Sequence, residues 1–430
     1  MAQIKDGFTK TLETFFPVVT PRQLIVKQSL GSWVKDVSGL KYLDLAGGQF
    51  CSVLGHANKR VFRAIKSQFF KGVDTDTSTY SEAALGAVRD LRKIAPDISP
   101  RSILLSTGAE ANEFALRYAK HISGKEGVLS FSQGYYGQTL GTAAYSMSRD
   151  RTKPVVSESY HFPAPSSPKP SYGGFDESES LSIAREIIRV HGGTIGVAIF
   201  EPIVSGGGML IPSKAFFQEL FRILKESKIL TIVDEAQSGY ARTGSWFHYQ
   251  NLEIEPDFVT VAKAIGLGFP VSAVLVNSRT IPQLDFPMKH FSSHQNEPLA
   301  GSIVSAGIRE IERGGILNRN IVRGLQIRNL ILNISKESPS IAKPRGEGML
   351  IGFDISEIKD GGNLELAMKR GARFVELCQR ERLLIQTCNY GRTVRLLPMY
   401  TLRNREIEFL KKALTKAAII FTTELKEGII

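Results

Sequence analysis

Cysteine and long apolar runs are scarce in this sequence of 430 residues. Three cysteines, Cys51, Cys378 and Cys388, are too few and too scattered for a disulfide framework or a cysteine-based metal cluster. No apolar stretch approaches the roughly 20 residues needed to cross a bilayer. The first seven residues lack the apolar core of a secretory signal. We therefore expect a cytoplasmic protein that works in a reducing environment and without a membrane.

The composition is that of an ordinary folded protein. Apolar residues make up 42% and charged residues 22% of the chain, which excludes a mainly disordered protein. The 39 glycines follow no regular spacing, which excludes a collagen-like chain. Domains commonly hold roughly 100–200 residues, so the length predicts two domains, or one large and one small.

The charge balance is basic, with 54 Lys and Arg against 42 Asp and Glu and a net charge of +12. Such a balance is compatible with nucleic acid, an acidic membrane surface or small anionic substrates. The basic residues are spread along the whole chain, and the densest runs are short. A solvated basic surface is therefore the simplest explanation, and nucleic-acid binding is the least favoured function.

Apolar, β-branched runs alternate with amphipathic stretches through the first two thirds of the chain, which indicates βα units and a largely parallel sheet. The predicted strands are 102–106, 127–132, 194–200, 229–233, 258–262 and 271–276. Two predicted helices between them are 180–190 and 215–227. A stretch rich in Pro, Ser and Gly predicts a long surface loop over residues 151–180.

The pattern changes after about residue 300. Helices are predicted over residues 299–313, 317–335, 364–381 and 403–424, with strands at 346–354, 383–387 and 393–397. Together with a hairpin-like segment at 23–45, these elements predict a smaller α+β domain built from both chain ends. The expected division is an N-terminal segment 1–55 that packs with the small domain, a large domain 56–300 and a small domain 301–430.

Ligands bind beyond the carboxyl ends of the strands in a parallel α/β sheet. The polar segments at those ends are Thr107-Gly108-Ala109, Gly134-Tyr135-Tyr136, Glu201 to Ser205, Asp234 to Gln237, and Lys263. A helix start binds phosphate through backbone N–H groups. An aromatic side chain stacks on a flat ring, an acid holds a ring N–H, and a lysine forms an imine. Together these groups describe a site for pyridoxal phosphate (PLP), whose protonated ring nitrogen needs an anionic partner.

Each of these features alone has a simpler explanation. Thr107 is a common helix cap, and Asp234 could cap a helix or anchor Mg²⁺. Lys263 alone is more often a solvated lysine. Order and spacing favour the PLP site, because Asp234 and Lys263 are 29 residues apart, about one βα unit, and each ends a buried strand.

Three segments carry a resemblance to a known family: Ser106 to Glu113, Val233 to Gly244 and Val261 to Pro270. Over residues 20–425 the chain resembles the class III (ω-type) PLP-dependent aminotransferases of fold type I. The resemblance implies a mixed, mostly parallel sheet in a large domain and a smaller α+β domain. It also implies a homodimer, or a dimer of dimers, whose active sites are shared between subunits.

The resemblance assigns roles at the cofactor ring. Lys263 would bind PLP as a Schiff base and then move protons as general base and acid, which requires a pKa lowered towards neutrality. Asp234 would pair with the ring nitrogen and Gln237 with the phenolic oxygen, while Tyr135 would stack on the ring. The phosphate would be held by Thr107, Gly108, Ala109 and, from the partner subunit, Ser293. Asn112 and Glu201 match family residues that support the site.

Within the family, the segments are most similar to those of the 2,2-dialkylglycine decarboxylases. Gln49 and Ser205 match residues that hold the substrate carboxylate perpendicular to the cofactor ring. Arg395 matches an arginine that binds a carboxylate in the plane of the ring, a task suited to a guanidinium. Without the family, Gln49 is explained as a polar loop residue and Arg395 as a surface arginine.

The sequence departs from the decarboxylases at the substrate side. Tyr135-Tyr136-Gly137 replaces Trp-His-Gly, and Gln138 replaces a methionine, which indicates a more polar substrate. At an alkali-metal position of the decarboxylases, shared with Ser78 and Ser293, Glu297 replaces an aspartate and is one methylene too long. We therefore expect no metal there.

These observations predict a PLP-dependent aminotransferase that moves an amino group from an amino acid to a 2-oxo acid such as pyruvate. Whether the donor is also decarboxylated is left open by the sequence. The alternative is an aminomutase or an amino-acid racemase or epimerase of the same family. A basic entrance around Arg395 would attract the anionic substrates, and most of the remaining charge is expected on the surface.

Overall fold

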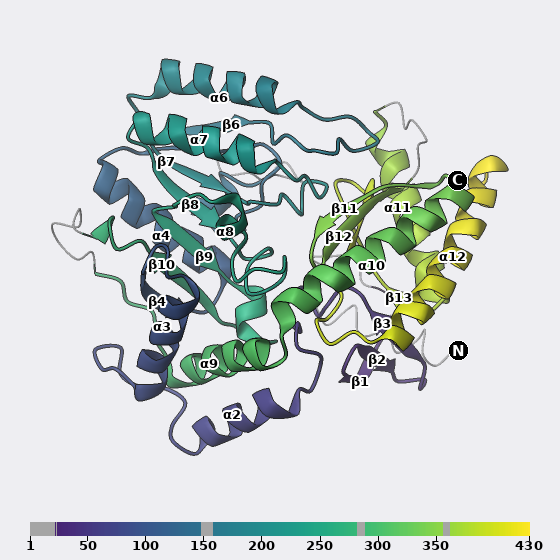
Figure 1. Cartoon of the computed structure of the whole chain (residues 1–430), viewed down its shortest axis with the longest axis horizontal. Coiled ribbons are helices and arrows are strands. Elements are labelled where there is room, and N and C mark those ends of the chain that lie inside the picture. Colours follow the sequence, from purple (N-terminus) through teal and green to yellow (C-terminus); the bar gives the residue numbers. More distant parts are fainter. Residues whose placement is uncertain (1–21, 23, 148–157, 282–288, 356–361) are drawn as a thin grey trace.

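The computed structural model describes residues 22, 24–147, 158–281, 289–355 and 362–430. Figure 1 shows a larger part around one sheet and a smaller part beside it. The helices α9 (Pro298–Arg313) and α10 (Ile316–Glu337) run from the first part to the second. None of the described helices is both long and apolar enough to span a membrane.

The larger part contains a seven-stranded sheet. Its strands are, in spatial order, β4 (Arg101–Leu105), β10 (Ser272–Val276), β9 (Phe258–Val261), β8 (Leu230–Asp234), β7 (Ile195–Phe200), β5 (Gly127–Phe131) and β6 (Ser159–Phe162). β10 runs antiparallel to both of its neighbours, β4 and β9, and the other neighbouring pairs of this sheet are parallel. The mixed, mostly parallel sheet is thus confirmed, and the continuous apolar runs of β5 and β7 are explained because both strands are buried along their length.

Helices flank this sheet. They are α2 (Lys59–Phe69), α3 (Glu82–Ile94), α4 (Gly108–Ser123), α5 (Leu140–Ala143), α6 (Glu177–His191), α7 (Lys214–Glu226) and α8 (His248–Leu252). The prediction of a loop over residues 151–180 is wrong in two places, because β6 pairs with β5 and α6 begins at Glu177. The strand was missed because its sequence, Ser-Tyr-His-Phe, is short and mostly polar. Residues 151–157 lie outside the described residues.

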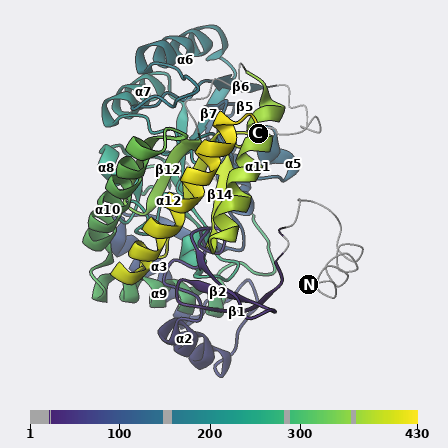
Figure 2. The same ribbon diagram turned by 90° about the vertical axis from the view of Figure 1, so that its right-hand side faces the viewer.

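The smaller part contains two four-stranded sheets. One joins β1 (Val26–Leu30), β2 (Trp33–Asp36), β3 (Lys41–Asp44) and β13 (Leu383–Leu384), so that segments from both halves of the chain pair. The other joins β11 (Ile341–Glu347), β12 (Leu350–Ile355), β15 (Thr393–Leu396) and β14 (Gln386–Cys388). In Figure 2, α10 lies beside α12 (Asn404–Lys426), with α11 (Leu364–Arg380) on the other side of α12.

The single strand predicted over residues 346–354 is instead a hairpin of β11 and β12. Gly348 makes the turn at φ +53°, and a Cβ there would lie 2.6 Å from the carbonyl oxygen of Arg242. A glycine inside an apolar run therefore marked a turn rather than a strand. The proposed domain boundary at residue 300 falls inside α9, which packs against α2 and α3, and the division into domains stays a prediction.

Candidate active site

Asp234 ends β8 in the middle of the large sheet, and its carboxylate is buried. Oδ2 accepts a hydrogen bond from Nδ2 of Asn112 at 2.8 Å, and Oδ1 accepts one from the backbone N–H of Ala236 at 2.9 Å. Asn112 is itself fixed, because its Oδ1 accepts a bond from the Thr260 hydroxyl at 2.6 Å. Burial raises the pKa of Asp234, while the nearby Lys263 opposes that shift. The site thus holds a rigid buried carboxyl group.

Lys263 follows β9, the neighbour of β8. Its backbone takes a left-handed conformation with φ +52°, which is uncommon for a residue other than glycine. Burial lowers the pKa of Lys263, and the carboxyl groups of Asp234 and Glu201 only partly offset this. A lysine with a lowered pKa holds more of the neutral amine, which is the form that acts as nucleophile and base.

The start of α4 borders the same cavity. The Thr107 hydroxyl caps the helix by accepting from the N–H of Glu110 at 3.2 Å, and Ser272 donates to the Thr107 carbonyl at 2.8 Å. A Cβ at Gly108 would lie 3.2 Å from the Cβ of Ala262, so the helix starts close against the lysine loop. Because the first N–H groups of a helix have no partner within the helix, this end favours an anion.

These groups surround one cavity of about 310 Å³. Eight predicted site residues line it: Thr107, Gly108, Ala109, Asn112, Tyr135, Gln138, Asp234 and Lys263. Tyr136 and Cys51 line it as well. The structure therefore brings together predicted residues that are up to 156 positions apart in the sequence, from Thr107 to Lys263, at the edge where the parallel strands end.

Glu201 and Gln237 form a buried pair next to this cavity. Oε1 of Glu201 accepts from the backbone N–H of Tyr135 at 2.7 Å, and Oε2 accepts from Nε2 of Gln237 at 2.9 Å. Burial, together with the charge of Asp234, raises the pKa of Glu201 to about 8. Glu201 therefore holds the Tyr135 loop and orients the Gln237 amide.

Three of the four predicted substrate residues, Gln49, Ser205 and Arg395, lie near one another, with the Arg395 guanidinium on β15 at the centre. Nη1 lies 3.4 Å from the Ser205 hydroxyl and 3.5 Å from Oε1 of Gln237. Nη2 donates to Gln386 at 3.2 Å, and Gln386 in turn donates to Gln49. These contacts fix the orientation of the Arg395 guanidinium, whose planar set of N–H donors suits a carboxylate.

A left-handed turn links Arg395 to Lys263. Four successive residues, Gly47 to Phe50, have φ values of 59°, 55°, 60° and 71°. The carboxylate of Asp44 accepts from three N–H groups at the start of this turn. As a result, the Phe50 ring lies 5.6 Å from Nζ of Lys263 and 5.3 Å from the Arg395 guanidinium carbon.

Sequence reasoning missed Phe50 and Gln386. The pair of glycines before Gln49 was the one available signal of an unusual turn, and it did not indicate which side chain the turn presents. Gln386 lies on a three-residue strand, β14, for which the sequence carries no motif.

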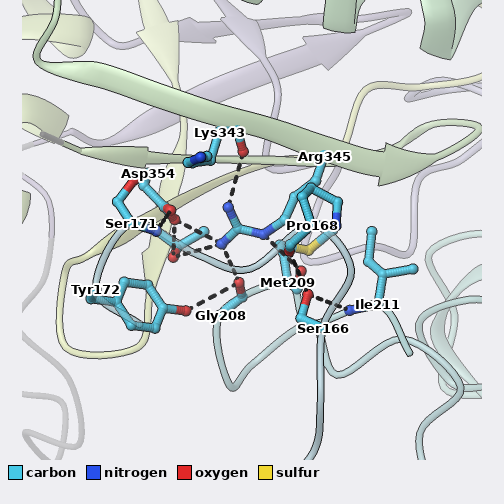
Figure 3. Close-up of polar contacts among 11 residues, drawn as sticks. Ser166, Pro168, Ser171, Tyr172, Gly208, Met209, Ile211, Lys343, Arg345 and Asp354 are labelled. Atoms are coloured by element: carbon cyan, nitrogen blue, oxygen red, sulfur yellow. Dashed lines mark hydrogen bonds and ion pairs between the residues drawn. The ribbon is translucent and has the colours of Figure 1, made fainter. Parts of the chain in front are cut away.

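Sequence reasoning also missed Arg345, which ties the small sheets to the Ser205 loop. Figure 3 shows its guanidinium between the carboxylate of Asp354 and the backbone of the loop. Nη2 lies 2.7 Å from Oδ1 of Asp354 and donates to the Gly208 carbonyl at 2.6 Å, while Nε donates to that of Met209 at 2.9 Å. Both charged side chains are buried, so β11 and β12 fix the loop that carries Ser205.

The side chains of Tyr136 and Ser293 do not take part in the hydrogen-bond networks described above. Tyr136 is buried, and its hydroxyl has no hydrogen-bond partner among the described residues. Burial and the carboxyl groups of Glu201 and Asp234 raise the pKa of this phenol. Ser293 is exposed and does not line the cavity of its own chain, so its predicted role across a subunit interface stays a prediction.

At the position that matches the alkali-metal site of the decarboxylases, two of the three residues make contacts within the described part of the chain. The Ser78 hydroxyl donates to Asp76, and Glu297 pairs with His294. Across the described ranges, no group of three or more His, Cys, Asp and Glu side chains could hold a metal ion.

Comparison with known proteins identifies the family. The model of the class III aminotransferases matches residues 17–418. An acetylornithine aminotransferase of Vibrio vulnificus is 28% identical over 408 residues, which cover 92% of this chain and 93% of that protein. A leucine/methionine racemase of Thermococcus litoralis is also 28% identical, over 416 residues that cover 94% of this chain and 93% of that protein.

The fold agrees with this result. The crystal structure of a Bacillus anthracis aminotransferase superposes with a TM-score of 0.87 at 23% identity, covering 98% of this chain and 99% of that one. The family model spans nearly the whole chain, including every segment that lines the cavity. The chain therefore belongs to the class III aminotransferases, a family of PLP-dependent enzymes of fold type I.

Proposed function

We propose that the protein is an aminotransferase that moves an amino group from an amino acid to a 2-oxo acid such as pyruvate. The observation that carries this proposal is the meeting of Asp234, Lys263 and the start of α4 around one cavity of about 310 Å³. A buried carboxylate, a lysine with a lowered pKa and a helix start fit the ring nitrogen, the aldehyde and the phosphate of PLP, in that order. The residues present therefore fit the cofactor of the family.

PLP, when bound, supplies an electron sink that stabilises negative charge at the substrate α-carbon. Asp234, fixed by Asn112 and Ala236, would hold the ring nitrogen in its protonated form. The amine of Lys263 would act as a base that takes a proton from the substrate α-carbon, and later as an acid that gives the proton back. Tyr135 would cover one face of the ring, and Gln237, oriented by Glu201, would bond its phenolic oxygen.

Arg395 would bind the carboxylate that amino acids and 2-oxo acids share. Its planar guanidinium suits a carboxylate, and the surrounding amides of Gln237 and Gln386 hold it in place. Gln49 and Ser205 would contact the same end of the substrate, with Gln138 on the cavity wall. Decarboxylation of the donor, and closeness to the 2,2-dialkylglycine decarboxylases, stay predictions.

The second candidate is an amino-acid racemase or epimerase, or an aminomutase. It is favoured by the similarity to the leucine/methionine racemase, which is as similar in sequence as the acetylornithine aminotransferase. Such an enzyme returns the proton to an amino acid and needs no 2-oxo acid. Turnover with and without pyruvate distinguishes the two candidates.

The cofactor role is tested on the purified protein. We expect an absorbance band near the visible edge that borohydride removes, with the resulting mass increase on Lys263. Lys263→Ala should lack both, whereas Lys66→Ala, on the exposed side of α2, should keep both. Absence of any PLP adduct on Lys263 in the wild type would contradict the proposal.

The reaction is tested with a panel of amino acids. Amino transfer to pyruvate without release of CO₂ supports simple transamination. Release of CO₂ from a dialkylglycine, collected in a trap, supports the decarboxylating form. Exchange of the α-hydrogen in the absence of pyruvate, without amino transfer in its presence, favours the racemase. We also propose a homodimer in which Ser293 reaches the phosphate of the partner's site. Sedimentation tests the dimer, and the PLP affinity of Ser293→Ala tests the role of the hydroxyl.

A further inference from the structure

A second, larger concavity lies where the first small sheet meets the ends of four helices. It has a volume of about 1260 Å³ and shares no lining residue with the active-site cavity in the described part of the chain. Its lining residues come from β1, β2 and β3, from the starts of α2, α10 and α12, and from the end of α9. Figure 1 labels these elements. We name it the basic basin after the basic residues that line it: Lys35, Lys41, Lys59, Arg60, Arg313, Arg319, Arg403 and Arg405.

The basin concentrates the charge of the molecule. Its lining holds eight Lys and Arg side chains against two carboxylates, Glu310 and Glu406. The resulting formal charge of +6 is half of the net +12 of the whole chain. Eight of the 54 Lys and Arg residues, from separate parts of the sequence, are therefore brought to one concavity by the fold.

The two carboxylates are already engaged. Glu310 pairs with Arg60 at 3.2 Å and with Arg313. Glu406 lies 2.9 Å from Nε of Arg405 and accepts from the backbone N–H of Arg403. Among the described residues, five basin cations have no ion pair: Lys35, Lys41, Lys59, Arg319 and Arg403.

The helix starts at the basin place further positive charge next to these cations. The starts of α2 and α10 carry no acidic residue in their first turns and instead present Lys59, Arg60 and Arg319. The partial positive charge at a helix N-terminus destabilises a cation placed there. Burial and the like charges of Arg323 and Arg403 lower the pKa of Arg319. A cluster that opposes local preference in this way indicates a binding site for an anion.

We propose that the basic basin binds a small polyanion that carries two or more phosphate groups, such as an inorganic polyphosphate or the polyphosphate of a nucleotide. The five unpaired cations come from β2, β3, α2, α10 and the residue before α12, so a compact ligand with several charges would contact more than one of them at once. A monocarboxylate neutralises one of them. The concave shape suits a small ligand better than a duplex.

The basin also borders the active-site loop. His56 lines the basin, and its Nε2 lies 2.9 Å from the Asp44 carboxylate. Asp44 in turn accepts the N–H groups that begin the turn carrying Gln49 and Phe50. The His56–Asp44 pair would therefore be the connection between the proposed ligand and the substrate end of the active site.

The test measures binding of inorganic tripolyphosphate by calorimetry at about 150 mM salt, on the purified holoenzyme. The basin variant is Lys59→Gln with Arg403→Gln, since both side chains are exposed and unpaired among the described residues. The matched control is Lys411→Gln with Lys412→Gln, which removes the same charge from exposed positions of α12 outside the basin. We expect saturable binding to the wild type and the control, and binding at least about tenfold weaker to the basin variant.

Three outcomes would overturn the proposal: no saturable binding to the wild type, equal weakening in both variants, or tighter binding of single-stranded RNA than of tripolyphosphate at the same salt. Comparing tripolyphosphate with a nucleoside triphosphate identifies the source of the phosphates. Sedimentation of the basin variant checks for a second copy in the basin, since loss of the oligomer in that variant alone would assign the basin to a subunit interface. None of these readouts depends on aminotransferase activity, so they stand apart from the proposed function.

Discussion

The two ends of the active site are built differently. At the cofactor end, Asp234 is fixed by Asn112 and Ala236 through bonds of 2.8 and 2.9 Å in the centre of a rigid sheet. At the substrate end, Arg395 is held by Ser205 and Gln237 at 3.4 and 3.5 Å, from loops and a small sheet. Short buried bonds to a carboxylate are strong, whereas longer ones to neutral groups adapt. The cofactor end is thus held by short bonds to a charged group, and the substrate end by longer bonds that can adjust to a ligand.

The largest effect is expected at the cofactor end, from Asp234→Asn. The amide keeps the shape but removes the negative charge that would hold a protonated ring nitrogen, so kcat should fall by on the order of 10²-fold or more for every substrate. Steady-state rates with three amino donors measure this. A loss confined to one donor would show that Asp234 acts on the substrate, which would contradict its assignment to the cofactor end.

Arg395→Gln should have a smaller effect that depends on the substrate. Loss of a charged partner for a carboxylate typically costs about 1.5–3 kcal/mol, so kcat/KM for amino acids should fall by about 10–100-fold. An amine without a carboxylate should be affected little. Arg395→Lys, which keeps the charge without the planar fork, is the control and should recover part of the loss. Equal losses for amines and amino acids would place Arg395 in a structural role.

Glu201 provides a test through pH. Its pKa is about 8 in the folded protein and 4.5 in the ordinary reference state, so the folded state binds the extra proton. The stability that this proton contributes is fully present below about pH 4.5 and is lost as the pH rises through about 8.

Glu201→Gln should therefore flatten the fall in unfolding free energy between pH 5.5 and 8.5, by about 1–3 kcal/mol in urea titrations. The exposed Glu427→Gln serves as the control and should leave the slope unchanged. A slope as steep in Glu201→Gln as in the wild type would assign the pH dependence to other buried carboxyls, such as Glu235, whose pKa burial raises to about 7.

The smallest effect is expected from Tyr136→Phe. The buried hydroxyl has no partner among the described residues, so its removal should leave the protein unchanged or more stable by up to about 1 kcal/mol. Thermal unfolding of the cofactor-free protein measures this. Destabilisation by more than that amount would show that the hydroxyl is bonded, which would extend the rigid cofactor end to Tyr136.

The cofactor end was predictable because its residues follow strands in sequence order. Thr107, Glu201, Asp234 and Lys263 each come within two residues of the end of a buried apolar run, and a parallel sheet brings such ends to one edge. The predicted structure was wrong where the local sequence pattern did not decide the backbone conformation. The short polar strand β6 was predicted as a loop, and the hairpin of β11 and β12 as one strand, since pairing partners and a glycine turn decided both.

The mostly parallel sheet and the residues at its carboxyl edge could be predicted from the amino-acid sequence, because apolar periodicity and strand order are local properties. What surrounds that edge depends on how distant segments pack together. Phe50 reaches Lys263 and Arg395 through a left-handed turn, and Gln386 reaches Gln49 across 337 positions of sequence. The positive charge is spread along the chain and becomes a basin only where helix starts converge. These features depend on packing between distant segments, for which a single sequence carries no period or motif.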